Sequence, residues 1–144
     1  ALEVQLPFLR RLRPEIEFVP ITLMRTDLAF CRAVGAGVAH AVKAWPEPVL
    51  LLASTDLNHY ESQAVSNLKD RKAIDKILKL DPRGLYDTVR HEGITMCGFG
   101  PAVSMMTAAR LLGGTRAEVI RYATSGDITG DREEVVGYAG IAVM

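Results

Sequence analysis

The sequence predicts an α/β protein with a mixed, largely parallel sheet flanked by helices. The continuous apolar run at residues 48–53 is typical of a strand buried on both faces of a parallel sheet. A β-rich stretch at residues 16–23 precedes an amphipathic helical pattern, and a strand–helix–strand unit of this length implies a right-handed crossover between parallel strands. Residues 118–123 and 135–143 are expected to form two further strands, antiparallel to each other.

Length and composition indicate one globular domain over residues 1–144. Hydrophobic residues make up 49% of the chain and charged residues 24%, which argues against disorder. The formal net charge is zero, so neither nucleic acid nor an acidic membrane surface is an expected partner. Since no apolar run approaches the roughly 20 residues of a membrane span and no signal-peptide pattern begins the chain, a cytoplasmic location is expected.

The N-terminal third contains two helical patterns. Residues 2–9 carry leucines at helical spacing and are expected to form a short amphipathic helix. Asp27 is a candidate N-cap for a longer helix whose apolar face extends through residues 28–45. Cys31 belongs to that face and is expected to be a small core residue, whereas His40 lies off the apolar stripe and is expected at the surface.

Three further helical patterns follow the central apolar run. One is centred on residues 73–78. The next begins at Asp81 and Pro82, where the aspartate caps the helix and the proline occupies its first position, and it ends at Gly93. A glycine-rich turn then leads into the third pattern, residues 102–112.

Polar side chains gather directly after the apolar run at residues 48–53. Asp56, Asn58, His59 and Tyr60 supply a carboxylate, an amide, an imidazole and a phenol. Open α/β sheets bind ligands beyond the carboxyl ends of their strands, so this stretch is a candidate site. The alternative is a polar turn in which the aspartate and the asparagine cap the next helix.

Cys97 is the second candidate, because it stands ahead of a helix in a glycine-rich turn. Together with His59 and Asp56 it could ligate a transition metal, or the three could act as nucleophile, base and orienting group. The close spacing typical of a zinc finger is missing. The alternative is a small turn residue at Cys97 and a helix cap at Asp56. Residues 125–131 lack the ligands of an EF-hand or a phosphate-binding loop and are expected to form a turn.

Four segments in this order resemble the Memo family, which is related in fold to the LigB-type class III extradiol dioxygenases. The segments lie at residues 2–9 (LEVQLPFL), 54–60 (STDLNHY), 96–101 (MCGFGP) and 125–139, the last beginning SGD and ending VGYA. The resemblance covers essentially the whole chain. It implies a sandwich in which helices flank a central sheet.

The resemblance also implies a dioxygenase-like metal and redox site that holds copper or iron. Cys97 stands where the dioxygenases have a carboxylate ligand, His59 matches their catalytic base and contributes to the metal site, and Asp56 is the polar residue beside it. The alternative is a non-catalytic module that binds a peptide or protein on a degenerate dioxygenase scaffold. Relatives of this kind are linked with AMMECR1-like partners.

The family's remaining metal-ligating histidines precede the motif at residues 2–9 and are not in this sequence. The chain is therefore expected to be the C-terminal part of a longer α/β domain, with an incomplete site. A partial sheet would expose apolar edges, so self-association or a partner segment is expected. His59 and Cys97 are expected to approach within roughly 10 Å, the span of a shared metal pocket.

Overall fold

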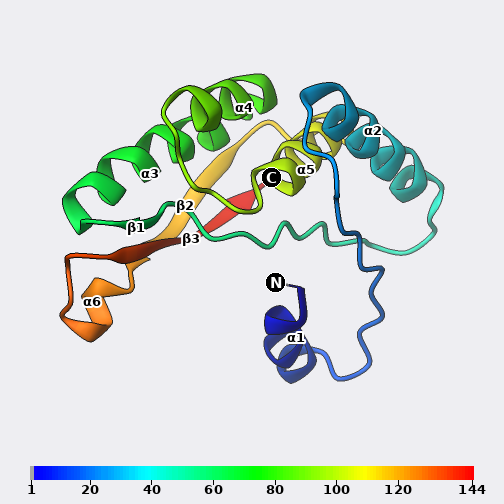
Figure 1. Ribbon diagram of the computed structural model, residues 1–144. Coiled ribbons are helices and arrows are strands. Elements are labelled where there is room, and N and C mark those ends of the chain that lie inside the picture. The colour runs from blue at the N-terminus through cyan, green and yellow to red at the C-terminus, as the bar shows by residue number, and fades with distance from the viewer. Residues whose placement is uncertain (1) are drawn as a thin grey trace.

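The sheet of this protein has three antiparallel strands. Helices α2 to α5 lie on one side of the sheet, and α1 lies away from them on the other side (Figure 1). The structure, a computed structural model, describes residues 2–144. Its elements follow one another as η1 (Leu2–Gln5), α1 (Leu6–Leu12), α2 (Leu28–Ala44), β1 (His59–Glu61), α3 (Gln63–Leu78), α4 (Pro82–His91), α5 (Phe99–Leu111), β2 (Ala117–Thr124), α6 (Gly126–Thr129) and β3 (Val135–Val143). Within these residues, no helix has both the length and the apolar content that a membrane crossing requires.

Strand β3 is the centre of the sheet, in the order β1-β3-β2. It pairs with β2 along its length, for example Tyr122 opposite Ala139, and with the short β1 through His59 opposite Val136. The predicted antiparallel pair near the C-terminus is confirmed. The connection between these strands is a turn containing α6, and Gly130 supplies its left-handed conformation with φ 81°.

The predicted largely parallel sheet is wrong. Residues 17–23 and 48–53 are extended but form no strand, and no backbone–backbone hydrogen bond is recorded for them within the described part of the chain. Most of their side chains are exposed, with Val19 at 84% and Leu50 at 75%, while Leu23 and Ala53 are partly buried against the core. A strand needs a neighbour to complete its ladder of hydrogen bonds, and an apolar sequence cannot supply that neighbour.

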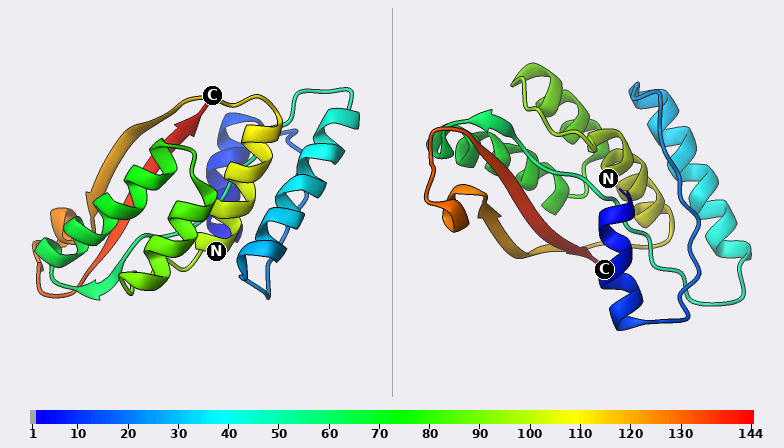
Figure 2. Two further views of the ribbon diagram at one scale, coloured as in Figure 1. Left: turned by 90° about the horizontal axis from the view of Figure 1, so that it is seen from above. Right: turned by 60° about the horizontal axis from the view of Figure 1, so that its bottom comes forward.

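Helix α2 packs on α5 rather than on the sheet (Figure 2). Its predicted start is confirmed, because the Asp27 carboxylate accepts a hydrogen bond from a backbone N–H in the first turn. Cys31 is fully buried as predicted, and its carbonyl accepts a hydrogen bond from Ser104 Oγ of α5 at 2.8 Å. His40 is exposed, also as predicted, but Trp45 is 60% exposed, so the apolar face ends before it.

Helix α3 begins at Gln63, well before the predicted helical pattern at residues 73–78. Ser62 caps it by accepting a hydrogen bond from a backbone N–H of the first turn. Its first half buries the polar residues Ser66 and Asp70 against the rest of the protein, so an apolar period could not reveal it.

The core lies between the helices and the sheet. Helix α4 starts as predicted, with Asp81 accepting from the Gly84 N–H at 2.8 Å, and Gly93 follows it with φ 58°. The buried cluster comprises Cys31, Leu57, Ala73, Ile74, Ile77, Leu85, Val89, Ile94, Met96, Ala102, Val103 and Met106. Leu57 and Met96 belong to the two polar segments that were expected to form the site, so the core anchors both segments.

A buried carboxylate joins α3 to the sheet. Asp70 is 0% exposed and accepts hydrogen bonds from the Asn58 N–H at 2.8 Å and from the Tyr122 hydroxyl at 2.7 Å. Burial raises the pKa of Asp70, although both hydrogen bonds oppose the rise. Burial and the neighbouring carboxylate raise the pKa of Tyr122, which keeps this phenol protonated as the donor.

Replacement of Asp70 by Asn should remove part of the pH dependence of stability. The pKa of Asp70 is above its unfolded value of about 3.9, so the native state loses stability as pH rises from about 4 through the folded pKa. Each unit of pKa difference corresponds to about 1.4 kcal/mol. Asn can keep both hydrogen bonds by accepting from Asn58 and donating to Tyr122.

Urea unfolding at a series of pH values checks this expectation. As pH rises from about 4, the unfolding free energy of the wild type should fall relative to that of Asp70→Asn. Asp75→Asn, an exposed position on the same helix, is the control and should follow the wild-type curve. Parallel curves for the wild type and Asp70→Asn would contradict the buried-carboxylate explanation.

Candidate metal centre

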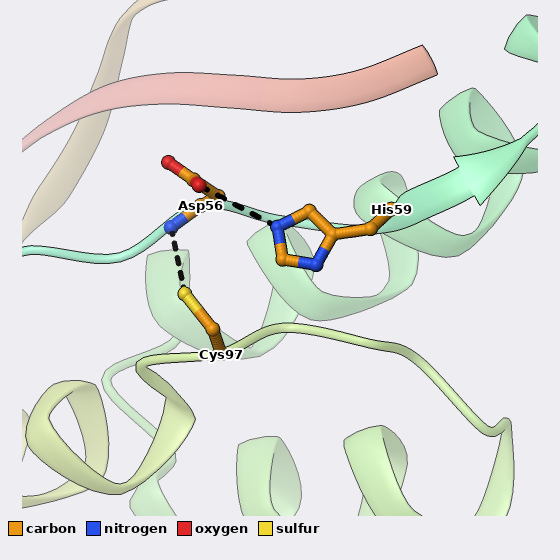
Figure 3. A group of neighbouring side chains, drawn as sticks. All are labelled: Asp56, His59 and Cys97. Carbon is orange, nitrogen blue, oxygen red and sulfur yellow. Dashed lines mark hydrogen bonds and ion pairs between the residues drawn. The ribbon is translucent and has the colours of Figure 1, made fainter. Parts of the chain in front are cut away.

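Asp56, His59 and Cys97 meet at one place although they come from different segments (Figure 3). Asp56 lies in the irregular segment before β1, His59 is the first residue of β1, and Cys97 lies in the turn before α5. One ligand atom from each residue lies within 4.8 Å of the other two. The predicted approach of His59 to Cys97 is confirmed.

The imidazole of His59 faces the Asp56 carboxylate. His59 Nε2 lies 3.5 Å from Asp56 Oδ2, and the His59 side chain is the less exposed of the two, at 16% against 48%. The contact is an ion pair when the imidazole is protonated, and a neutral imidazole keeps one ring nitrogen as an acceptor. The pair can therefore orient a histidine that binds a metal or takes a proton.

A β-bulge at Tyr60 directs His59 toward this place. The pairing of β1 with β3 shifts register between His59 and Glu61, and Tyr60 has a left-handed backbone with φ 59°. The Tyr60 side chain is 75% exposed, so no core contact requires the strained conformation. Bulges and left-handed non-glycine residues are frequent beside functional sites.

Cys97 is an exposed free thiol, and Cys31 is a separate buried one. The Asp56 N–H donates a hydrogen bond to Cys97 Sγ at 3.5 Å, and Thr55 Oγ1 lies 3.8 Å from the same sulfur. The next residue, Gly98, donates its N–H to Thr55 Oγ1 at 2.8 Å. A Cβ at position 98 would overlap the Thr55 side chain, so this close approach requires glycine.

Asn58 ties the segment carrying His59 to α3 and to the Cys97 turn. Its Nδ2 donates to Glu61 Oε2 at 2.6 Å and to Ser66 Oγ at 3.1 Å. Its Oδ1 accepts from the Thr95 N–H at 3.1 Å and from Thr95 Oγ1 at 3.2 Å. Sequence reasoning placed Asn58 in the site or at a helix cap; the structure gives it a buried supporting position instead.

Thr95 is a residue of the site that sequence reasoning missed. Its Oγ1 accepts a hydrogen bond from the His59 N–H at 2.7 Å, although Thr95 itself is exposed. A threonine in a loop has no pattern that would mark it, and neither does Thr55. Their importance follows only from the tertiary contacts.

Glu61 stays outside the group of three. Its carboxylate binds Lys69 Nζ at 2.7 Å, and the hydrogen bonds from Lys69 and then Asn58 lower its pKa. The acidic turn near α6 is also separate, because Asp127 accepts from the Thr124 N–H at 2.7 Å and so closes its own loop. The turn predicted over residues 125–131 thus contains the short helix α6, which the sequence did not indicate.

Two pockets of about 330 and 340 Å³ adjoin the group. Both are lined by Gln5, Thr55, Asp56 and Tyr138. Cys97 lines one of them, and the other extends along the sheet to Arg121. Pockets of this size can accept a small organic molecule beside Asp56 and Cys97, whereas His59 lines neither pocket.

The donor set fits a transition metal. A thiolate, an imidazole and a carboxylate suit iron, copper or zinc, whereas magnesium and calcium prefer oxygen ligands alone. Cys97, His59 and Asp56 could each supply one ligand atom. Three protein ligands leave coordination positions open, which is typical of catalytic metal sites rather than closed structural ones.

Comparison with known proteins identifies relatives along the whole chain. A family model described as Memo-like protein matches residues 1–142. A MEMO1 family protein of Methanothermobacter thermautotrophicus is 39% identical over 140 residues, which cover 97% of this chain and 50% of that protein. A MEMO1 family protein of Methanocaldococcus jannaschii is 41% identical over 147 residues, which cover 99% of this chain and 51% of that protein.

This chain thus spans about half the length of the curated relatives it matches. The match extends through the segments that carry Asp56, His59 and Cys97. The resemblance inferred from the sequence motifs is confirmed at the level of the family. The chain belongs to the Memo-like protein family.

Proposed function

We propose that this chain carries the Asp56–His59–Cys97 part of a metal-dependent oxidoreductase site. The observation that carries the proposal is the convergence of one oxygen, one nitrogen and one sulfur ligand within 4.8 Å. The two adjoining pockets support it, because a reacting molecule needs room beside the metal. The resemblance to LigB-type dioxygenases favours redox chemistry on an oxygen-bearing organic substrate.

Copper or iron is the proposed metal. A soft thiolate from Cys97 beside an imidazole from His59 favours these redox-active metals. When bound, such a metal would exchange electrons with a substrate and polarise its oxygen atoms. Because a thiolate replaces the dioxygenase carboxylate, ordinary catechol cleavage does not follow from the resemblance.

His59 and Asp56 have the roles of a proton-transfer pair. The carboxylate of Asp56 fixes the orientation of the imidazole, to which it lies at 3.5 Å. When its second nitrogen is not bound to the metal, His59 can accept a proton from a substrate hydroxyl held near Asp56, which lines both pockets, and return it later in the reaction. Orientation by a carboxylate is the usual means of choosing which imidazole nitrogen is free.

Replacement of Cys97 by Ser should weaken metal binding strongly. Loss of a supporting residue around a metal commonly costs 10–100-fold in affinity, so loss of the thiolate should cost at least about tenfold. Anaerobic titration with Cu(I) and with Fe(II) measures the change. His59→Ala should also weaken binding.

Cys31→Ala is the matched control for the thiol. Cys31 is buried between α2 and α5, so its removal should leave the metal affinity of the folded protein unchanged. Equal affinities for the wild type and Cys97→Ser would remove Cys97 from the site and overturn the proposal.

A specific observation also favours a second function, binding of a polypeptide without catalysis. Residues 17–23 and 48–53 are apolar and extended and have no recorded backbone partner in the described chain. Phe18, Val19 and Leu50 are exposed there at 49%, 84% and 75%. Such segments are templates for strand addition by a partner protein or by a second copy of the chain.

The exposed segments should cause self-association that a charge suppresses. Wild-type protein should elute above the monomer mass in size-exclusion chromatography and bind a dye for exposed apolar surface. Leu50→Lys should lower both signals, because burying the ammonium group in an apolar contact is unfavourable. Leu68→Lys is the control, since Leu68 is 63% exposed on α3, away from both segments. A wild-type monomer without dye binding would refute this reading.

A further inference from the structure

We infer that Thr55 and Thr95 are positioning residues that hold the Cys97 turn against the segment of Asp56 and His59. The inference rests on the proposed metal site and adds two residues that act on it without touching the metal. Each threonine bridges the two segments through its hydroxyl group. On the turn, Cys97 lies between the two bridged positions, Thr95 and Gly98.

The first bridge is at Thr95, on the side of the turn that precedes Cys97. Its hydroxyl oxygen accepts the His59 N–H at 2.7 Å, and the hydroxyl lies 3.2 Å from Asn58 Oδ1, which it can donate to. Thr95 is exposed, so its side chain adds little to the core. Its contacts instead fix the backbone that carries the imidazole.

The second bridge is at Thr55, on the side of the turn that follows Cys97. Its hydroxyl oxygen accepts the Gly98 N–H at 2.8 Å and donates to the Asp56 carbonyl at 2.7 Å. The Thr55 hydroxyl therefore links Gly98, the residue after Cys97, to Asp56. This bridge keeps the sulfur close to the Asp56 N–H, at 3.5 Å.

The two bridges act against a rigid support. Asn58, which receives the Thr95 contacts, is fully buried and is bound through its backbone N–H to the buried Asp70. With one segment fixed in this way, the threonine hydroxyls determine how far Cys97 stands from His59. Without one bridge, the distance between the Cys97 sulfur and the His59 imidazole should vary more. Metal affinity depends on such supporting contacts.

The test compares Thr95→Val, which removes the hydroxyl but keeps the shape, with Thr95→Ser, which retains the hydroxyl. Co(II) is the probe, since a bound thiolate gives a sulfur-to-cobalt charge-transfer band in the near ultraviolet. Thr95→Val should bind Co(II) about tenfold more weakly and with an altered band, and Thr95→Ser should match the wild type. Thr107→Val removes a comparable hydroxyl within α5, which bonds to Val103 O at 2.8 Å, and should leave Co(II) binding unchanged.

Amide hydrogen exchange of the metal-free protein separates this inference from the proposed function. In Thr95→Val the His59 amide should exchange faster, while the Gly98 amide, held by Thr55, should not change. Wild-type Co(II) affinity and an unchanged band in Thr95→Val would overturn the positioning role, even if the wild type binds the metal. If the wild type binds no Co(II), the proposed function fails. Independently of the metal, an unchanged exchange rate of the His59 amide in Thr95→Val would show that Thr95 does not hold this backbone, and would overturn the inference.

Discussion

The buried amide of Asn58 is the interaction on which the candidate site depends. An asparagine side chain has two N–H donors and a carbonyl with two lone pairs, and here all four are used, on Glu61, Ser66 and Thr95. A buried polar group left without partners costs free energy, so the protein is held to the arrangement that satisfies it. That arrangement brings β1, α3 and the Cys97 turn together.

The rest of the fold places the candidate metal ligands close to Asn58. Strand β3 holds β1 at the edge of a small antiparallel sheet, and the bulge at Tyr60 places His59 toward the turn before α5. Helix α3 is attached to the sheet through the buried carboxylate of Asp70. A left-handed Tyr60 is a strained feature, and such strain persists only where the surrounding contacts define the structure well.

Features set by local chemistry were predictable from the sequence. The caps at Asp27 and Asp81 and the C-terminal hairpin depend on residues close in the chain, and their predictions are confirmed. The strand expected at residues 48–53 depends on a neighbour, and its apolar pattern predicted burial that the structure does not have. The three ligand candidates were predictable because their side chains carry unusual chemistry. The supporting roles of Asn58 and Thr95 were not, because ordinary polar residues gain them only through contacts distant in sequence.

X-ray absorption spectroscopy of the Fe(II)-loaded protein tests most directly the claim that Asp56, His59 and Cys97 bind one metal. The account predicts one sulfur among the atoms bound directly to iron, together with nitrogen and oxygen. In Cys97→Ser that sulfur should be lost while the lighter ligands remain. A wild-type spectrum with only nitrogen and oxygen neighbours would contradict it, since Cys97 would then lie beside the metal without binding it.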